Sequence, residues 1–287
     1  LIVVAASAVM LMFGVTKGIE KVNKVLMPAF FILFAIIAVR VAFLPGAEKG
    51  YEFLFVPDWS KLLEPNTWVM AMGQAFFSLS ITGSGMIVYG TYLAKSEDIP
   101  KASVRTAVFD TIAAMLAALA IMPAVFAFGI EPSSGPPLMF ITLPGIFKQM
   151  PFGRVFAVLF FVSVVFAGIT SLINMFEAVS ESWQTRFKLK RNTAILLCTA
   201  IAFIVGVFLE AEPKVGSWMD FITIIVVPFG AVLGAVSIYY ILGFDEIKKE
   251  LETGRDKPLG KYFKPIAKYI YVPLAVIVFV LGILYGG

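Results

Sequence analysis

Apolar stretches long enough, or nearly long enough, to cross a bilayer as helices recur eight times along the sequence. They run over Leu1–Val15, Val25–Leu44, Trp68–Leu93, Ala102–Gly129, Val155–Val179, Thr193–Leu209, Phe221–Gly243 and Tyr269–Tyr285. Hydrophobic residues make up 60% of the chain and charged residues 15%, which leaves too little polar surface for a soluble domain. The sequence therefore predicts an all-α, multi-pass membrane protein, with residues 1–287 forming one transmembrane domain.

Basic residues are shared unequally between alternate loops. With the loop after the first stretch in the cytoplasm, the inner loops hold 17 lysines and arginines and the outer loops hold 6. This bias predicts a multi-pass protein of the inner or plasma membrane. It also accounts for the net charge of +4, so we expect no nucleic-acid partner. Both chain ends are then predicted outside, and because the chain starts without Met or a basic leader, we expect further helices before it.

Several classes of enzyme lack their required residues. The chain has no histidine, which excludes a His-dependent triad and histidine ligands for haem or zinc. Its one cysteine, Cys198, excludes an intrachain disulfide. No nucleophile–base pair and no glycine-rich phosphate loop stand out in the sequence. We therefore expect a function that is not enzymatic.

The third apolar stretch differs from a plain membrane helix. Hydroxyl residues and glycines gather near its centre, at Ser78, Ser80, Thr82, Gly83, Ser84 and Gly85. Alternate serines do not form a helical face, and glycine lowers helix propensity where water cannot replace a lost backbone bond. We predict one half-helix to about Leu79, an unwound link, and a second half-helix from about Met86. Broken membrane helices mark transporter binding sites, although small residues also serve simply to pack helix against helix.

Carboxylates interrupt the later stretches. Asp110 lies in the fourth stretch among alanines, at a cost of about 2.5–3.5 kcal/mol for a mid-helix charge. A cation, a proton, a hydrogen-bonding pocket or a Lys or Arg on another helix would offset that cost. Asp220, at the start of the seventh stretch, is either an interfacial charge or half of a gate.

The fifth stretch carries a polar stripe at helical spacing, formed by Thr170, Ser171, Asn174, Glu177 and Glu181. A stripe that ends in two carboxylates favours a functional face. The alternative for its hydroxyls is a hydrogen bond to a preceding carbonyl of the same helix. Between the fourth and fifth stretches, the proline-rich and apolar loop 131–153 is too apolar for a floppy linker, and we expect a re-entrant lid.

Together these motifs resemble those of a known transporter family. Gln74-Ala75-Phe76-Phe77-Ser78-Leu79-Ser80, followed by the break and Tyr89-Gly90-Thr91-Tyr92-Leu93, is similar to the sixth helix of the neurotransmitter:sodium symporters, which have the LeuT-type fold. Further matches are Lys17-Gly18-Ile19-Glu20-Lys21, Phe109-Asp110-Thr111, Phe140-Ile141-Thr142-Leu143-Pro144 and Phe166-Ala167-Gly168-Ile169-Thr170-Ser171. The resemblance covers essentially the whole chain. It implies a partial LeuT-type inverted-repeat fold in which the eight stretches are the family's fourth to eleventh helices and its first three are absent.

The resemblance implies two sodium sites, each half-formed here because the family's first helix supplies the rest. Ser78 and Asp110 correspond to ligands of the first sodium. The carbonyl of Ala167 and the hydroxyls of Thr170 and Ser171 correspond to ligands of the second. Hard oxygen donors suit a hard cation. Chloride-dependent members carry a serine one turn after Asp110, where this chain has Ala114, so we do not expect chloride to be used.

Substrate and gate positions follow from the same resemblance. The implied substrate pocket comprises Phe77, Ser78, Ser80, Gly83, Ser171 and Met175. The implied gate positions are Phe77, Tyr92, Glu177 and Asp220. Gly83 stands where a bulky residue is common, which predicts a wide pocket for a large apolar or aromatic amino acid. The family's inner-gate acid falls near Thr185, so we expect Glu177 or Glu181 to replace it.

We therefore expect sodium-coupled symport of an amino acid into the cell by alternating access. Two other interpretations stay open. One is a non-transporting fragment or structural half that needs a separate N-terminal piece. The other is a sodium-independent amino-acid permease of the same fold, which would leave Asp110, Thr170 and Ser171 without a purpose.

Overall fold

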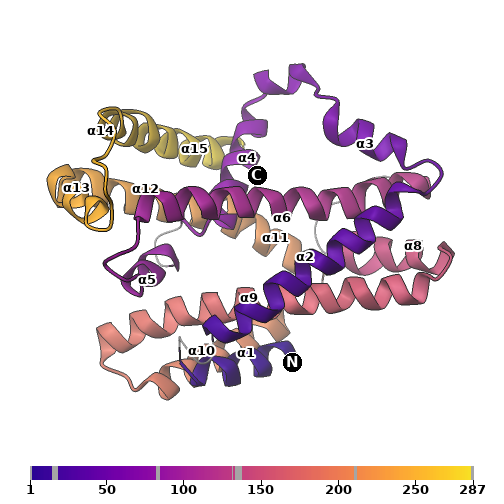
Figure 1. Cartoon of the computed structure of the whole chain (residues 1–287), viewed down its shortest axis with the longest axis horizontal. Helices are drawn as coiled ribbons and strands as arrows, with labels where there is room; N and C mark the ends of the chain where they lie inside the picture. Colours follow the sequence, from indigo (N-terminus) through magenta and orange to yellow (C-terminus); the bar gives the residue numbers. More distant parts are fainter. Residues whose placement is uncertain are drawn as a thin grey trace. The chain divides into compact units, whose positions relative to one another are not determined.

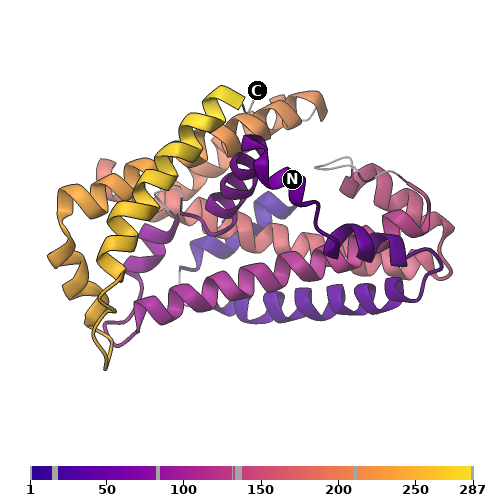
Figure 2. The same ribbon diagram turned by 90° about the horizontal axis from the view of Figure 1, so that it is seen from above.

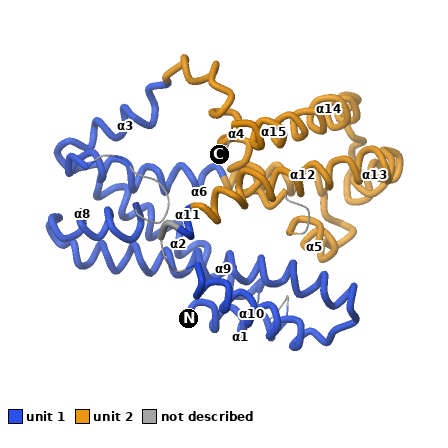
Figure 3. The backbone as a smooth tube through the Cα atoms, turned by 180° about the vertical axis from the view of Figure 1, so that it is seen from behind, with its two compact units in different colours: residues 1–57, 111–216 blue, residues 58–110, 217–287 orange. Residues whose placement is uncertain are grey.

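A computed structural model describes residues 2–14, 19–81, 85–130, 132, 138–209 and 212–285. These residues form helices joined by turns, with no strand among them, which confirms the predicted all-α class. The chain divides into two compact units, each of which is discontinuous in sequence (Figure 3). Unit 1 comprises residues 1–57 and 111–216, and unit 2 comprises residues 58–110 and 217–287.

Six helical stretches among the described residues are long and apolar enough to cross a membrane. They are Lys21–Ala42, Ile99–Ala127, Gly153–Phe187, Arg191–Phe208, Lys214–Leu242 and Phe263–Tyr285. The other two predicted stretches are helical but shorter. The first is α1 (Ile2–Met12), and the third is divided into α4 (Pro65–Ser78) and α5 (Gly85–Thr91), as the sequence predicted for a broken helix.

Unit 1 is built around α9 (Gly153–Phe187), the long helix seen in Figure 1. The helices α1, α2 (Lys21–Ala42), α8 (Leu143–Gln149) and α10 (Arg191–Phe208) all pack against it. The ring of Phe160 is buried on α9 and lies 5.6 Å from the rings of both Phe34 and Phe147. Since lipid tails are as apolar as these side chains, close packing, rather than exclusion from water, holds such helices together.

Two further segments of unit 1 cover the same core. The helix α3 (Glu48–Phe55) packs so closely on α6 (Ile99–Ala127) that a Cβ atom at Gly50 would lie 2.4 Å from the Cα atom of Pro123. From the expected lid, the π-helical turn η3 (Leu138–Thr142) leads into α8, whose Leu143, Ile146 and Phe147 are buried in the core. The described part of that loop thus packs onto α9. The remainder of the lid prediction, at 131 and 133–137, lies outside the described residues.

Unit 2 is held by α4, α12 (Val227–Val236) and α15 (Val272–Tyr285), which pack on one another. Figures 1 and 2 both show α12 and α15 side by side. A Cβ atom at Gly73 would lie 3.2 Å from the carbonyl oxygen of Thr223, and one at Gly282 would lie 2.8 Å from that of Ile224. A side chain at Gly282 would therefore displace the π-helical turn η4 (Phe221–Val226) or α15, and the approach of α4 to η4 at Gly73 is tight.

Prolines account for the position of three π-helical turns. Pro144, Pro228 and Pro273 are each the second residue of an α-helix that follows a π-helical turn, namely η3, η4 and η6 (Ala267–Tyr271). Proline has no amide proton and its ring clashes with the carbonyl four residues earlier, so the regular ladder cannot continue through it. In the seventh apolar stretch the α-helix is therefore interrupted at η4, which separates α11 (Glu212–Asp220) from α12; η5 (Ser237–Leu242) completes the stretch.

Candidate functional site

The break after α4 is a defined chain reversal. The amide of Ser80 donates to the carbonyl of Phe77 at 3.0 Å, and the amide of Ile81 donates to the carbonyl of Phe76 at 3.0 Å. Ser80 itself has φ of 52° in the left-handed region. This pair of bonds is the Schellman motif, with serine at the position that glycine usually occupies. At the end of the helix, the carbonyls of Phe76 and Phe77 are therefore satisfied by amides of the link.

These bonds change one expectation for the unwound link. An unwound link in a membrane helix can offer free amides and carbonyls to a solute, but here the amides of Leu79, Ser80 and Ile81 all bond carbonyls of α4. None of these three bonds uses the carbonyl of Ser78. A Cβ atom at Gly85 would lie 3.2 Å from the Cβ atom of Ser80, so the start of α5 returns close to the end of α4. The predicted substrate position Gly83 lies outside the described residues.

The predicted ligands of the first sodium meet within unit 2. The hydroxyl of Ser78 donates a hydrogen bond to Oδ2 of Asp110 at 3.0 Å. Asp110 is half-buried on α6, and among the described residues no ion pair involves it. Within the described ranges, the structure thus gives Asp110 a hydroxyl partner and no Lys or Arg partner. A carboxylate, a hydroxyl and the Ser78 carbonyl together offer oxygen donors of the kind that bind hard cations.

The predicted ligands of the second sodium lie on one turn of α9 in unit 1. Thr170 is 1% exposed, and its hydroxyl donates to the carbonyls of Phe166 at 3.1 Å and Ala167 at 2.9 Å. This is the bond to a preceding carbonyl that the sequence left open as the alternative. The donated proton leaves the lone pairs of the Thr170 oxygen for another partner. Ser171 is exposed, so the two hydroxyls do not share one environment.

A buried ion pair joins three helices of unit 1. Glu177 is fully buried on α9, and both of its carboxylate oxygens accept from Arg191 at the start of α10, at 3.0 and 2.7 Å. Nη2 of Arg191 also donates to the carbonyl of Leu11 in α1 at 3.1 Å. Sequence reasoning singled out Glu177 as a gate position and treated Arg191 only as a loop charge. The pair could have been suspected from the sequence, because an acid within one helix and a basic residue at the start of the next can face each other.

The remaining predicted positions are more open. Phe77 is 41% exposed in the last turn of α4, and Met175 is 50% exposed on α9. Tyr92 is 38% exposed, with its ring centroid 6.0 Å from that of Tyr89. Asp220 is exposed at the C-terminal residue of α11. Within its units, the structure thus brings Ser78 to Asp110 and Thr170 to Ala167.

Known proteins resemble this chain along its length. A protein of Bacillus subtilis, described as the uncharacterized sodium-dependent transporter YhdH, is 34% identical over 99% of this chain and 66% of its own length. An uncharacterized sodium-dependent transporter of Haemophilus influenzae is 32% identical over 97% of this chain and 63% of its own length. The chain therefore spans about two thirds of the length of these relatives.

The fold is also that of a solved transporter structure. The crystal structure of MhsT in complex with L-phenylalanine matches 98% of this chain and 66% of that chain, with a TM-score of 0.87 and 31% sequence identity. The model of the sodium:neurotransmitter symporter family matches residues 1–285. That family consists of transporters and not of enzymes. The fold, the broken third stretch and these matches agree, and the chain belongs to the sodium:neurotransmitter symporter family.

Proposed function

We propose that the protein is a sodium-coupled symporter that carries an amino acid into the cell, across the plasma membrane, by alternating access. The observation that carries the proposal is the bond between Ser78, where α4 ends, and the Asp110 carboxylate on α6. A carboxylate inside a membrane span needs a cation, a proton or hydrogen-bond donors to offset its cost, and among the described residues no basic side chain pairs with Asp110. A sodium ion held by Ser78 and Asp110 would meet that need.

The second proposed sodium site consists of the Ala167 carbonyl with the hydroxyls of Thr170 and Ser171. Its support is the burial of Thr170, whose oxygen keeps its lone pairs for another partner. In this proposal, both sodium sites need further oxygen donors in addition to the residues named for them. Chloride is not used, because Ala114 offers no hydroxyl next to Asp110 and the Asp110 carboxylate already supplies the negative charge.

The proposed substrate contacts are assigned to each unit separately. In unit 2 they are Phe77, Ser78, Ser80 and Gly83; in unit 1 they are Ser171 and Met175. Ser171 and Met175 are one helical turn apart on α9, and both are exposed. We infer a large apolar or aromatic amino acid, and the presence of L-phenylalanine in the MhsT complex supports this class.

Sodium would favour the outward-open state because it binds that state more tightly, and its release inside would reset the cycle. Phe77, Tyr92, Asp220 and Glu177 are the proposed gate residues. For Glu177 the support is its ion pair with Arg191, which also holds the Leu11 carbonyl at the end of α1. Rearrangement of this pair would release the end of α1 from α10.

The test is uptake of labelled L-phenylalanine into proteoliposomes that contain the purified protein. We expect uptake to require an inward sodium gradient, to stop when potassium replaces sodium, and to persist when gluconate replaces chloride. Undiminished uptake in potassium would overturn sodium coupling. A competition screen with unlabelled amino acids then defines the substrate, and competition by small polar amino acids alone would overturn the inferred substrate class.

A matched pair of variants ties transport to the proposed site. Asp110→Ala is expected to abolish sodium-dependent uptake, whereas Asp245→Ala, which removes an exposed acid at the start of α13 (Phe244–Glu252), is expected to retain it. Equal uptake by the two variants would contradict the assignment of Asp110.

A further inference from the structure

The segment that leads into the last candidate span carries charge that the proposed transport cycle does not use. Residues 257–270 contain Lys257, Lys261, Lys264 and Lys268 and no acidic residue. We call these residues the lysine segment. It includes α14 (Phe263–Ile266) and the first turns of the candidate span Phe263–Tyr285. Its lysines therefore lie where a membrane helix emerges from the lipid.

Two acidic side chains of unit 2, Glu252 and Asp98, bond groups other than the lysines of the segment. Oε1 of Glu252 accepts the amide of Leu259 at 2.7 Å. Oδ1 of Asp98 accepts the amide of Lys101 at 3.1 Å at the start of α6 and lies 3.6 Å from Nη1 of Arg255. Among the described carboxylates, none forms an ion pair with a lysine of the segment. In the part of the chain that the structure describes, the lysines of the segment are therefore not held in ion pairs.

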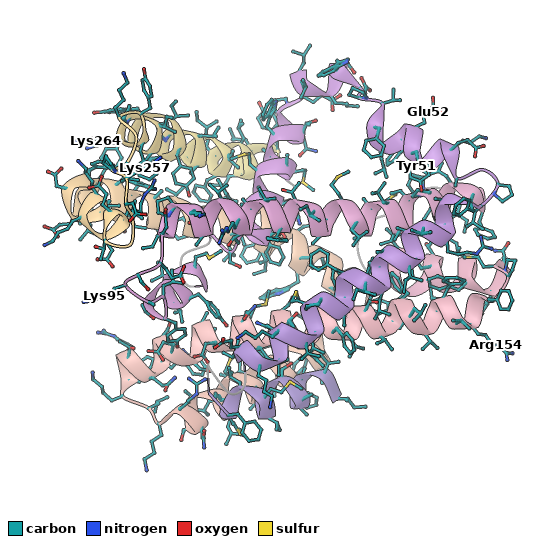
Figure 4. All side chains as sticks on the ribbon, in the orientation of Figure 1. Tyr51, Glu52, Lys95, Arg154, Lys257 and Lys264 are labelled. Atoms are coloured by element: carbon teal, nitrogen blue, oxygen red, sulfur yellow. The ribbon has the colours of Figure 1, made fainter. Side chains whose placement is uncertain are left out.

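The fold holds this segment in place. The hydroxyl of Tyr240 donates to the carbonyl of Lys268 at 2.8 Å, and Nζ of Lys268 lies 4.4 Å from the centroid of the Tyr240 ring. The ring of Phe263 packs on Phe244, and Nζ of Lys264 lies 5.2 Å from the Phe244 centroid. Figure 4 shows Lys257 and Lys264 at the same end of unit 2, beside α13 and α14. A charged tail without structure would have none of these contacts.

Apolar and aromatic side chains are exposed between the lysines. Tyr262 is 65% exposed and Tyr269 is 67% exposed, while Ile266 and Ile270 are 52% and 59% exposed. Tyrosine is enriched at the depth of lipid headgroups, and lysine keeps its charge at that depth while its stem lies against apolar surface. An acidic soluble protein would account for the lysines but would leave the isoleucines facing water. A lipid surface accounts for both.

We propose that the lysine segment binds anionic phospholipid headgroups, with Lys257, Lys261 and Lys264 contacting the phosphate and Tyr262 and Tyr269 lying at headgroup depth. The phosphate carries the negative charge that the segment lacks, and the acyl chains cover Ile266 and Ile270. Clusters of basic residues that directly flank a membrane helix attract anionic lipids in this way. This site is separate from the proposed ion and substrate positions.

The test is a titration of the purified protein in neutral detergent with phosphatidylglycerol or phosphatidylcholine, followed by native mass spectrometry. We expect phosphatidylglycerol to bind more tightly than phosphatidylcholine. The variant K257Q/K261Q/K264Q should weaken the first phosphatidylglycerol by about a hundredfold, or about fivefold for each lysine, and should leave phosphatidylcholine unchanged. Unchanged phosphatidylglycerol binding by this variant, or equal binding of the two lipids by the wild type, would overturn the proposal.

Two further variants separate the site from general charge and folding effects. K49Q/K148Q/R154Q removes three exposed charges from unit 1, two of them in the helices α3 and α8, and should keep the wild-type affinity. K257R/K261R/K264R keeps the charge of the segment and should also bind normally. A loss in either variant as large as that in the glutamine variant would contradict the proposal. Inorganic phosphate at millimolar concentration should not displace the lipid, and full displacement would identify a free-anion site instead.

Discussion

The hydroxyl of Ser78 donates a hydrogen bond to the carboxylate of Asp110 at 3.0 Å. Ser78 is the last residue of α4, and Asp110 lies inside the long helix α6. The contact therefore joins the end of the first half-helix to a carboxylate that lies within a membrane span. Transport, in our proposal, depends on this point.

This contact predicts coupled effects of substitution at the two residues. Ser78→Ala leaves the carboxylate without its donor, and Asp110→Asn keeps the shape but removes the charge. A hydrogen bond to a charged group contributes about 1.5–3 kcal/mol, so each variant should raise the sodium concentration needed for half-maximal uptake by about tenfold or more. In a double-mutant cycle, the free energy of sodium dependence lost in the double variant should be smaller than the sum of the losses in the two single variants. Simple additivity would show that the two groups act independently.

Backbone strain at Ser80 predicts a stabilising substitution. A left-handed conformation costs a non-glycine residue about 1–2 kcal/mol, and glycine avoids this cost. The gain in stability is only part of it, because glycine loses more backbone entropy on folding than serine does. Ser80→Gly should therefore raise the thermal unfolding midpoint of the purified protein. Ser237→Gly is the control, since Ser237 has φ of −59° and helical geometry, and it should lower the midpoint. If both substitutions act in the same direction, strain at Ser80 is not the cause.

The buried pair of Glu177 and Arg191 predicts a large loss of stability when one partner is removed. Glu177→Ala leaves a partly buried guanidinium without its carboxylate, which costs about 3–5 kcal/mol. Glu177→Ala with Arg191→Leu should recover much of that loss. Glu181→Ala is the matched control, because the contacts of Glu181 to Gln184 and Thr185 are both 3.4 Å. Thermal unfolding in detergent measures all four proteins, and a small effect of Glu177→Ala alone would contradict the buried pair.

Two glycines in membrane helices of unit 2 should respond oppositely to alanine. A Cβ atom at Gly282 would lie 2.8 Å from the carbonyl oxygen of Ile224, so Gly282→Ala must displace α15 from η4 and destabilise the protein. A Cβ atom at Gly234 would meet no neighbouring helix within 4 Å, so Gly234→Ala should stabilise α12 by up to about 1 kcal/mol. Thermal midpoints compare the two, and equal shifts would argue against the close approach at Gly282.

An exposed carboxylate in the loop before α4 predicts a local dependence on pH. The hydroxyl and the amide of Ser60 donate to Asp58, and with the charge of Lys61 they lower the pKa of Asp58 below its ordinary value of 3.8. Because the folded-state pKa is the lower one, the capping of η2 (Trp59–Leu63) is fully present above pH 3.8 and is lost as the pH falls through the folded-state pKa. Hydrogen exchange of the Ser60 amide should accelerate relative to its neighbours at low pH. In Asp58→Ala this extra acceleration should be missing.

Much of the site could be predicted from local sequence. The end of α4 at Ser78 and the start of α5 at Gly85 lie within one residue of the predicted ends of the two half-helices. This succeeded because hydroxyls and glycines act on the backbone within a few residues of themselves. The same local chemistry did not reveal that the amides of the link are already bonded, since that depends on the left-handed conformation of Ser80.

By itself, the sequence determined where this chain is apolar enough to form membrane helices and where one of them must break, because both properties depend on neighbouring residues. Only the tertiary structure decided which groups are bonded across helices: Ser78 to Asp110, and Arg191 to Glu177. The physical reason is that a buried polar group bonds whichever group the packing of the helices places within about 3 Å, and that distance is set by contacts between residues far apart in the chain.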